Sequence, residues 1–191
     1  MALQPNQEDL RKVHNEVNQI MHQRFLVTTA AITVFGIMIA WSFPRTAEAV
    51  DEQRILSTCA VSVSLNLVLA ALSWLNISLR RYSRVLTTYL VVANMSGWEA
   101  DWEKHRRFLK FRHTDYNKPQ SLVFLLLGVL ATLYPFFVTG VSGLEYPSRL
   151  AVGSVVAAGL LELILAGVSL SKRIEGESDA KDQWQAVNRL T

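Results

Sequence analysis

The chain has 191 residues, half of them hydrophobic, and a net charge of +3 from nineteen Lys and Arg against sixteen Asp and Glu. The hydrophobic residues form four blocks of about twenty residues each, which excludes an ordinary soluble domain of this size. Cys59 is the single cysteine, so an intramolecular disulfide is excluded as well. Residues 1–9 lack the basic start of a cleaved signal peptide, and we expect the first block to stay in the mature protein.

An amphipathic helix is predicted over residues 6–24, before the first block. Its apolar residues Leu10, Val13, Val17 and Ile20 follow 3-4-3 spacing and share one face. We favour packing of this stripe on the protein's own cytoplasmic helices. The alternative is a neck through which copies of the chain associate.

Four membrane spans are predicted, at residues 25–43, 55–79, 121–139 and 149–171. They form two hairpins, at 25–79 and 119–171, each with a short outer loop. The second span is unusually polar, and its polar residues should face other helices rather than lipid. These residues are Ser57, Thr58, Ser62, Ser64, Asn66, Ser73 and Asn76. In the fourth span, the pairs Gly153/Ala157 and Ser154/Ala158 have the spacing that permits close helix approach.

A basic segment at residues 80–118 lies between the hairpins and carries nine Lys and Arg against four acids. Its residues 85–95 are apolar enough to lie at the membrane interface or to prolong the second span into the cytoplasm. Ser96 and Glu99 match a capping box, so a helix should begin there and run to about His113. Trp98 and Trp102 share one face of it. We favour packing of these tryptophans against the N-terminal helix over insertion into the membrane surface. The candidate contacts for a partner or a membrane surface are Trp98, Trp102, Arg106, Arg107 and Lys110.

The distribution of positive charge predicts the orientation. Residues 1–24, 80–118 and 172–191 carry three, nine and four Lys and Arg, whereas the outer side has three: Arg45 and Arg54 in the first loop and Arg149 at the start of the fourth span. By the positive-inside rule, both termini and the basic segment are cytoplasmic. We therefore expect a multi-pass protein of a bacterial-type inner membrane, with residues 172–191 as a cytoplasmic tail.

Glu162 is the side chain that costs the most free energy to place in a membrane, because it lies halfway along the fourth span. An acid at that depth costs about 2.5–3.5 kcal/mol, so it should face protein or water. The spans offer no Lys or Arg at this depth, and a neutral, protonated carboxyl is then favoured. The expected partners are Asn66, Thr33, Thr132 or Glu162 of another copy. Glu162 and Asn66 form the candidate intramembrane site. One hypothesis is a proton or cation site or a pore-lining ring, and the other is a carboxyl that only joins helices.

The sequence offers no sign of an enzyme. It has no P-loop, no G-x-G-x-x-G, no H-E-x-x-H and no C-x-x-C motif, and we expect no catalytic residues, cofactor or metal. The tryptophans and arginines of the basic segment could stack on and pair with nucleic acid. The positive-inside rule already accounts for their charge, so we do not expect nucleic-acid binding.

The predicted fold is therefore all-α and polytopic, with four spans in two hairpins and a small helical cytoplasmic layer. With so little soluble mass, we expect a homo-oligomer in the lipid bilayer. The favoured function is a sensor or scaffold that couples a membrane event to a cytoplasmic protein partner. One alternative is a pore-forming effector lined by Glu162 or the polar face of span two. A small transporter is disfavoured, because the hairpins show no internal repeat.

The layout of two hairpins, short outer loops and a basic middle resembles the four-span membrane components of bacterial anti-phage systems, such as the membrane subunit of Kiwa. The resemblance covers the whole chain as architecture and carries over no functional residue. It implies an oligomeric sensor in antiviral defence with a cytoplasmic partner protein.

Overall fold

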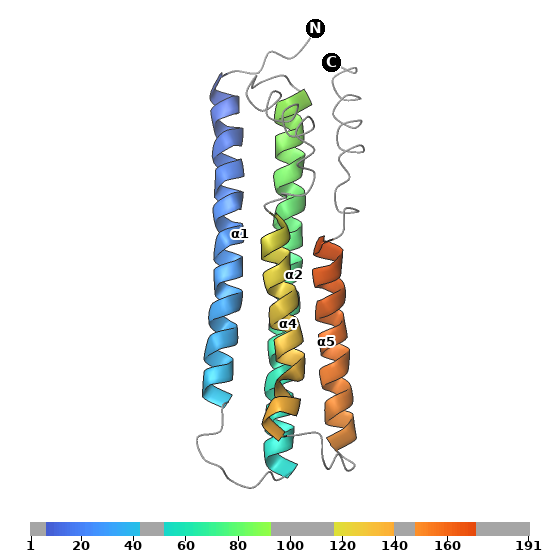
Figure 1. The fold of residues 1–191 in the computed structure, drawn as a ribbon. Helices are drawn as coiled ribbons and strands as arrows, with labels where there is room; N and C mark the ends of the chain where they lie inside the picture. The colour runs from blue at the N-terminus through green and yellow to red at the C-terminus, as the bar shows by residue number, and fades with distance from the viewer. Residues whose placement is uncertain (1–6, 43–51, 93–116, 140–147, 171–191) are drawn as a thin grey trace. The chain divides into compact units, whose positions relative to one another are not determined.

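The computed structural model describes residues 7–42, 52–92, 117–139 and 148–170, which form four α-helices and no β-strand (Figure 1). They are α1 (Gln7–Ser42), α2 (Glu52–Val92), α4 (Asn117–Thr139) and α5 (Ser148–Leu170). Each is long and apolar enough to cross a membrane. The prediction of an all-α fold with four candidate spans is confirmed for the described part of the chain.

Two of the helices are longer than a bilayer requires. At about 1.5 Å per residue, the 23 residues of α4 and of α5 extend about 35 Å, close to the hydrocarbon thickness of about 30 Å. The 36 residues of α1 and the 41 of α2 extend about 54 and about 62 Å. The separate N-terminal helix and first span of the sequence analysis are thus one helix. Likewise, the second span continues without interruption to Val92.

The chain divides into two compact units. Unit 1 comprises Met1–Leu26, Ile77–Lys118 and Lys172–Thr191, and unit 2 comprises Val27–Asn76 and Pro119–Ser171. In unit 2, the described parts of the four helices form a bundle in which consecutive helices run in opposite directions (Figure 1). Short connections between neighbouring antiparallel helices are typical of such bundles.

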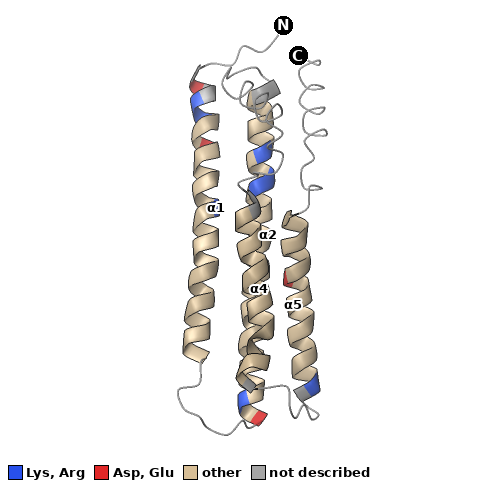
Figure 2. Ribbon diagram, in the orientation of Figure 1, with Lys and Arg blue, Asp and Glu red and all other residues tan. Residues whose placement is uncertain are grey.

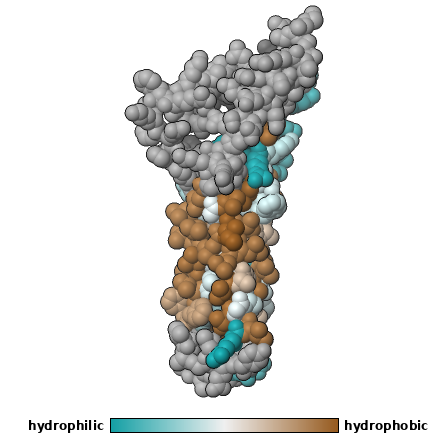
Figure 3. Space-filling view, turned by 90° about the vertical axis from the view of Figure 1, so that its right-hand side faces the viewer, coloured by the Kyte–Doolittle hydropathy of each residue, from teal (hydrophilic) through white to brown (hydrophobic). Residues whose placement is uncertain are grey.

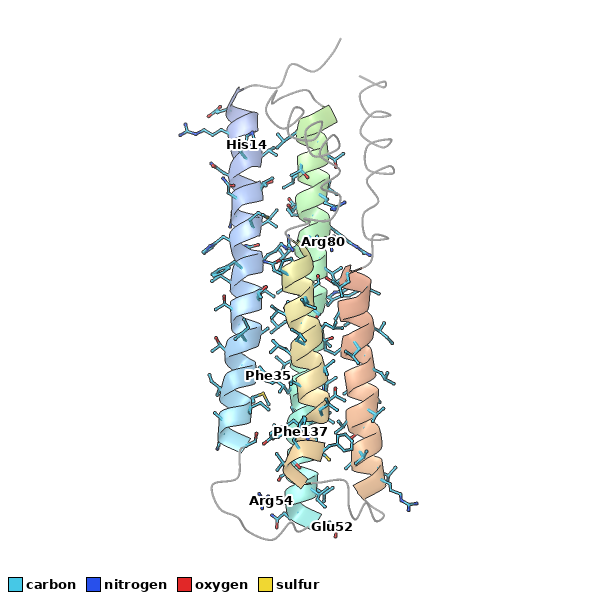
Figure 4. The ribbon with its side chains drawn as sticks, in the orientation of Figure 1. His14, Phe35, Glu52, Arg54, Arg80 and Phe137 are labelled. Atoms are coloured by element: carbon cyan, nitrogen blue, oxygen red, sulfur yellow. The ribbon has the colours of Figure 1, made fainter. Side chains whose placement is uncertain are left out.

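The core of unit 2 draws on all four helices. The fully buried cluster includes Ala31 of α1, Leu65 and Leu69 of α2, Phe124 of α4 and Ala166 of α5. Partly buried side chains of α1 cover this cluster, and Figure 4 labels one of them, Phe35. Burial of these side chains follows the 3-4 spacing of a bundle helix, with one stripe of each helix facing inward.

Apolar side chains cover the outside of unit 2, as a bilayer requires. Figure 3 shows a broad hydrophobic surface, and Figure 2 shows that charged residues are almost absent from the middle of the helices. Trp41 and Phe137, near the ends of α1 and α4, are 82% and 77% exposed (Figure 4 labels Phe137). Exposed aromatic residues at helix ends are typical of the membrane–water interface. The structure therefore fits a multi-pass membrane protein.

The described part of unit 1 consists of residues 7–26 of α1, 77–92 of α2 and 117–118 of α4. Ile20 is buried, and Val13 and Val17 are half-buried. This burial fits packing of the N-terminal stripe within the chain. Arg24 and Arg80 are also buried, each with 4% exposure, although the sequence analysis singled out neither.

Candidate functional site

A stripe of polar side chains on α2 faces the interior of unit 2. Ser62, Asn66, Ser73 and Asn76 are each at most 2% exposed. Together with Leu69 they follow 4-3-4-3 spacing, which places them on one face of the helix. We call these four residues the polar stripe. The expectation that the polar residues of this span face other helices is wrong for Ser57 and Ser64, which are exposed.

One half of the polar stripe joins α2 to α4. Ser62 Oγ donates a hydrogen bond of 2.6 Å to the carbonyl oxygen of Ala131, and Asn66 Nδ2 donates one of 3.0 Å to the carbonyl oxygen of Ser62. Thr132 Oγ1 lies 2.8 Å from the carbonyl oxygen of Gly128 and 3.4 Å from Asn66 Oδ1. Because a hydroxyl has one hydrogen, the shorter contact is its main bond. Asn66 is therefore bonded mainly to its own helix, with Thr132 of α4 as a weaker contact.

The other half of the stripe joins α2 to α5 through Glu162. The Glu162 side chain is fully buried, and Ser73 Oγ donates a hydrogen bond of 3.1 Å to its Oε1 atom. Its second oxygen, Oε2, is buried without a hydrogen-bond partner among the described residues. Burial of a polar atom without a partner is costly in a protein interior. Only one of the two carboxyl oxygens of Glu162 therefore has a hydrogen-bond donor among the described residues.

Glycine makes room for this carboxyl group on α4. A Cβ atom at Gly128 would lie 3.2 Å from both Cγ and Cδ of Glu162 and 3.5 Å from Oε1. Such contacts are tighter than side chains normally make, so a larger residue would press on the acid. Ser73 and Gly128 thus hold the Glu162 carboxyl from two sides, and we call these three residues the Glu162 site.

The register of α4 against α5 is regular over residues 121–132 of α4 and 159–169 of α5. Ser121 Oγ lies 2.6 Å from Ser169 Oγ at one end, Gly128 faces Glu162 in the middle, and Thr132 faces Gly159 beyond it. Along this contact the residue numbers of α5 decrease as those of α4 increase, as expected for antiparallel helices. The seven-residue steps from Ser121 to Gly128 and from Ser169 to Glu162 place these contacts on one seam.

The structure corrects the sequence analysis at two points of this site. Asn66 and Glu162 are both buried in unit 2, but the donor to Glu162 is Ser73 and not Asn66, Thr33 or Thr132. Thr33 is exposed and donates to the carbonyl oxygen of Thr29 in its own helix. Spacing within one helix does not reveal the depth at which two helices meet, which is why the partner was misassigned.

The second correction concerns the small residues of α5. Gly153, Ser154 and Ala157 are exposed, and a Cβ atom at Gly153 would meet nothing within 4 Å. Close approach within the described bundle is made instead by Gly159 of α5 and Gly128 of α4. The sequence analysis missed both glycines. The sequence does contain a signal for Gly159, because 4-3-4-3 spacing places it on the same face of α5 as Glu162. The residues on this face are Val155, Gly159, Glu162, Ala166 and Ser169.

The remaining candidate residues lie outside the described part of the chain. These are Trp98, Trp102, Arg106, Arg107 and Lys110 of the basic segment. Among the residues that the structure describes, no group of three or more His, Cys, Asp or Glu side chains could hold a metal ion.

Comparison with known proteins gives no match: no family model, no curated protein and no solved structure matches this chain. The resemblance to membrane components of anti-phage systems therefore stays a prediction from the layout of the chain.

Proposed function

We propose that this protein is an oligomeric inner-membrane sensor and scaffold that couples a membrane event to a cytoplasmic protein partner. The observation that carries the proposal is the continuity of α2. This single helix bears the buried polar stripe and then runs on into the basic segment, as far as Val92. A rearrangement around Ser73 would therefore reach the start of that segment along a continuous helix rather than through a loop.

The partner is assigned to the basic segment because that is where positive charge and aromatic residues coincide. Residues 80–118 hold nine of the nineteen Lys and Arg of the chain and two of its five tryptophans. Such a surface would attract an acidic protein face, with the tryptophans as apolar anchors. The layout shared with anti-phage membrane components supports antiviral defence as the setting.

Native mass spectrometry of the detergent-extracted protein, with and without co-expressed genomic neighbours, tests the proposal. The test variant carries Arg106→Glu, Arg107→Glu and Lys110→Glu. Its matched control carries Lys181→Glu and Arg189→Glu in the tail. We expect wild type and control to retain the partner and the test variant to lose it, with the same oligomer mass in all three. Retention of the partner by the test variant, or no partner from any neighbour, would contradict the proposal.

The role of helix continuity is tested at Tyr82, which is 51% exposed on α2. Tyr82→Pro interrupts the helix at little cost in packing, and Tyr82→Ala leaves it intact. Each variant is prepared with and without Ser73→Ala, and partner binding is measured in lipid vesicles. We expect Ser73→Ala to change partner binding beside Tyr82→Ala but not beside Tyr82→Pro. An equal effect of Ser73→Ala in both would show that α2 does not transmit the signal.

A pore-forming effector is the second candidate, and the half-satisfied Glu162 carboxyl is the observation that favours it. Within one chain, however, the polar stripe is closed by hydrogen bonds to α4 and α5. A pore would therefore need the bundle to open or several copies to line it together. Conductance of liposomes that contain the wild type, compared with Glu162→Gln, separates the two functions.

A further inference from the structure

We propose that the event sensed by this protein is the loss or gain of one proton at Glu162, which opens or closes the seam between α2, α4 and α5. The inference rests on the proposed function and names its trigger. It starts from geometry, because the carboxyl group is fully buried, with Oε1 bonded to Ser73 and Oε2 unbonded among the described residues.

The helical segments of unit 2 contain no charge beside Glu162. No Asp, Glu, Lys, Arg or His occurs in residues 55–79 of α2, 119–139 of α4 or 25–44 of α1, and Glu162 is the sole such residue in 150–170 of α5. The cations that flank these segments on α1, α2 and α5 include Arg24, Arg80 and Arg149, and no ion pair between any of them and Glu162 is seen among the described residues. The other titratable side chains in these segments are Cys59 and Tyr134. Cys59 is buried on α2, and the Tyr134 hydroxyl donates to Ser42 Oγ at 2.8 Å. Neither neutralises an ionised Glu162.

The two protonation states therefore place different demands on the bundle. The neutral acid keeps its bond from Ser73 and leaves one uncharged hydroxyl unsatisfied. The ionised acid leaves a full charge in the interior, with one donor for two oxygens, and charge burial of this kind is far more costly. Water must then reach Oε2, and the seam has to separate for water to enter. Low pH should close the seam, and high pH should open it.

A proton fits this site better than a metal cation. A bound cation needs several oxygen ligands, and the described side chains offer here the carboxyl group and one serine hydroxyl. Gly128 also lies so close that even an added methyl group would press on the carboxyl carbon, at 3.2 Å. The side of the carboxyl group that faces Gly128 therefore has no space for a cation.

Infrared spectroscopy of the full chain in lipid vesicles tests the protonation itself. Above about pH 5, where exposed Asp and Glu are ionised, the carbonyl stretch of a protonated carboxyl should remain and should fade as the pH rises further. In this range it should be missing in Glu162→Gln and should return, still pH-dependent, in Glu162→Asp. A band that Glu162→Gln retains, or that does not change with pH, would overturn the proposal.

Pulsed electron spin resonance tests the opening. Spin labels are attached through Leu67→Cys on α2 and Ile164→Cys on α5, two exposed positions, in a Cys59→Ser background. We expect the distance distribution between the labels to lengthen or broaden at high pH, and Glu162→Gln to keep the low-pH distribution throughout. If Glu162→Gln fails to assemble, Glu162→Asp serves, since it must reproduce the pH response. The same response in Glu162→Gln, or no response in the wild type, would refute the mechanism. Closure of the seam by sodium but not by potassium at high pH would show that the ligand of the site is a cation and not a proton.

The two proposals fail in different ways. If the wild type binds its partner equally at all pH values while Glu162 still titrates, the trigger is wrong and the scaffold stands. If no genomic neighbour binds at any pH while the seam still opens, the sensor–scaffold function is wrong and the proton site stands.

Discussion

Replacing Gly159 by alanine tests the seam between α4 and α5 at its tightest point. A Cβ atom at Gly159 would lie 2.9 Å from Thr132 Cγ2 and 3.1 Å from Thr132 Cβ, and closer still to Thr132 Oγ1. Thr132 is a poor candidate to move aside. It is β-branched, with few rotamers in a helix, and its hydroxyl bonds the carbonyl oxygen of Gly128. The helices therefore have to separate.

Two opposing terms set the size of the effect. Alanine stabilises a helix relative to glycine by about 1 kcal/mol. Overpacking of a closely packed contact costs about 1–3 kcal/mol. We expect Gly159→Ala to lower the free energy of unfolding by a net amount of about 0–2 kcal/mol relative to the wild type, and by about 1–3 kcal/mol relative to glycine-to-alanine changes without the contact. Gly153→Ala and Gly167→Ala are matched controls on the same helix, since nothing lies within 4 Å of either site. They should be neutral or slightly stabilising.

Reversible unfolding in mixed micelles, followed by circular dichroism, measures these differences. The double variant Gly159→Ala with Thr132→Ala removes the colliding atoms and should recover stability compared with Gly159→Ala alone. Equal stability of Gly159→Ala and Gly153→Ala would refute the close contact and the register built on it. Failure of the double variant to recover would instead assign the loss to something other than Thr132.

Further predictions concern orientation, the Glu162 site and the basic segment. Reporters fused after Thr191 and within residues 82–111 should be cytoplasmic, and those at Ala47 and Glu145 outside, as the charge distribution requires; a cytoplasmic Ala47 would overturn the topology. Ser73→Ala should lower the free energy of unfolding by about 1–2 kcal/mol, because a buried acceptor loses its donor. Ser64→Ala, at an exposed site of α2, should lower it by almost nothing, and equal losses would argue against the bond to Glu162. Ser96→Ala should weaken the start of its predicted helix by about 0.5–2 kcal/mol. Trp98→Ala with Trp102→Ala should reduce partner retention in native mass spectrometry, and unchanged retention would remove them from the contact surface.

The helical segments could be predicted from composition, but their continuity could not. The apolar blocks mark the membrane segments of α4 and α5 to within a few residues, because charged residues and turn-forming residues flank them. For α1 and α2, the sequence analysis ended segments at Arg24 and Leu79, where charge begins. Neither place has a Gly or Pro to end a helix. Charged residues mark where an apolar span ends, whereas the helix itself continues past them.

Glu162 itself could be predicted from its own span, whereas its partners could not. The cost of an acid at bilayer depth is a local property, so Glu162 could be found from one span. Its partners Ser73 and Gly128 depend on how far each helix slides against its neighbours, and spacing within one helix does not contain that distance. Two faces of α5 carry small residues, and the choice between Gly153 and Gly159 also depends on packing with α4.

The burial of the four helices explains how so polar a segment as α2 fits the bundle. In its most apolar window, α2 has 39% of its residues buried, the largest share of the four, whereas α1 has 11%. Polar side chains are tolerated inside a membrane when protein surrounds them, and the polar stripe of α2 has protein on both sides in α4 and α5. α1 instead exposes Ile32, Ile37 and Trp41, which lipid or another copy must cover. In the proposed sensor, α1 would therefore meet the bilayer, and the shielded α2 would carry the response.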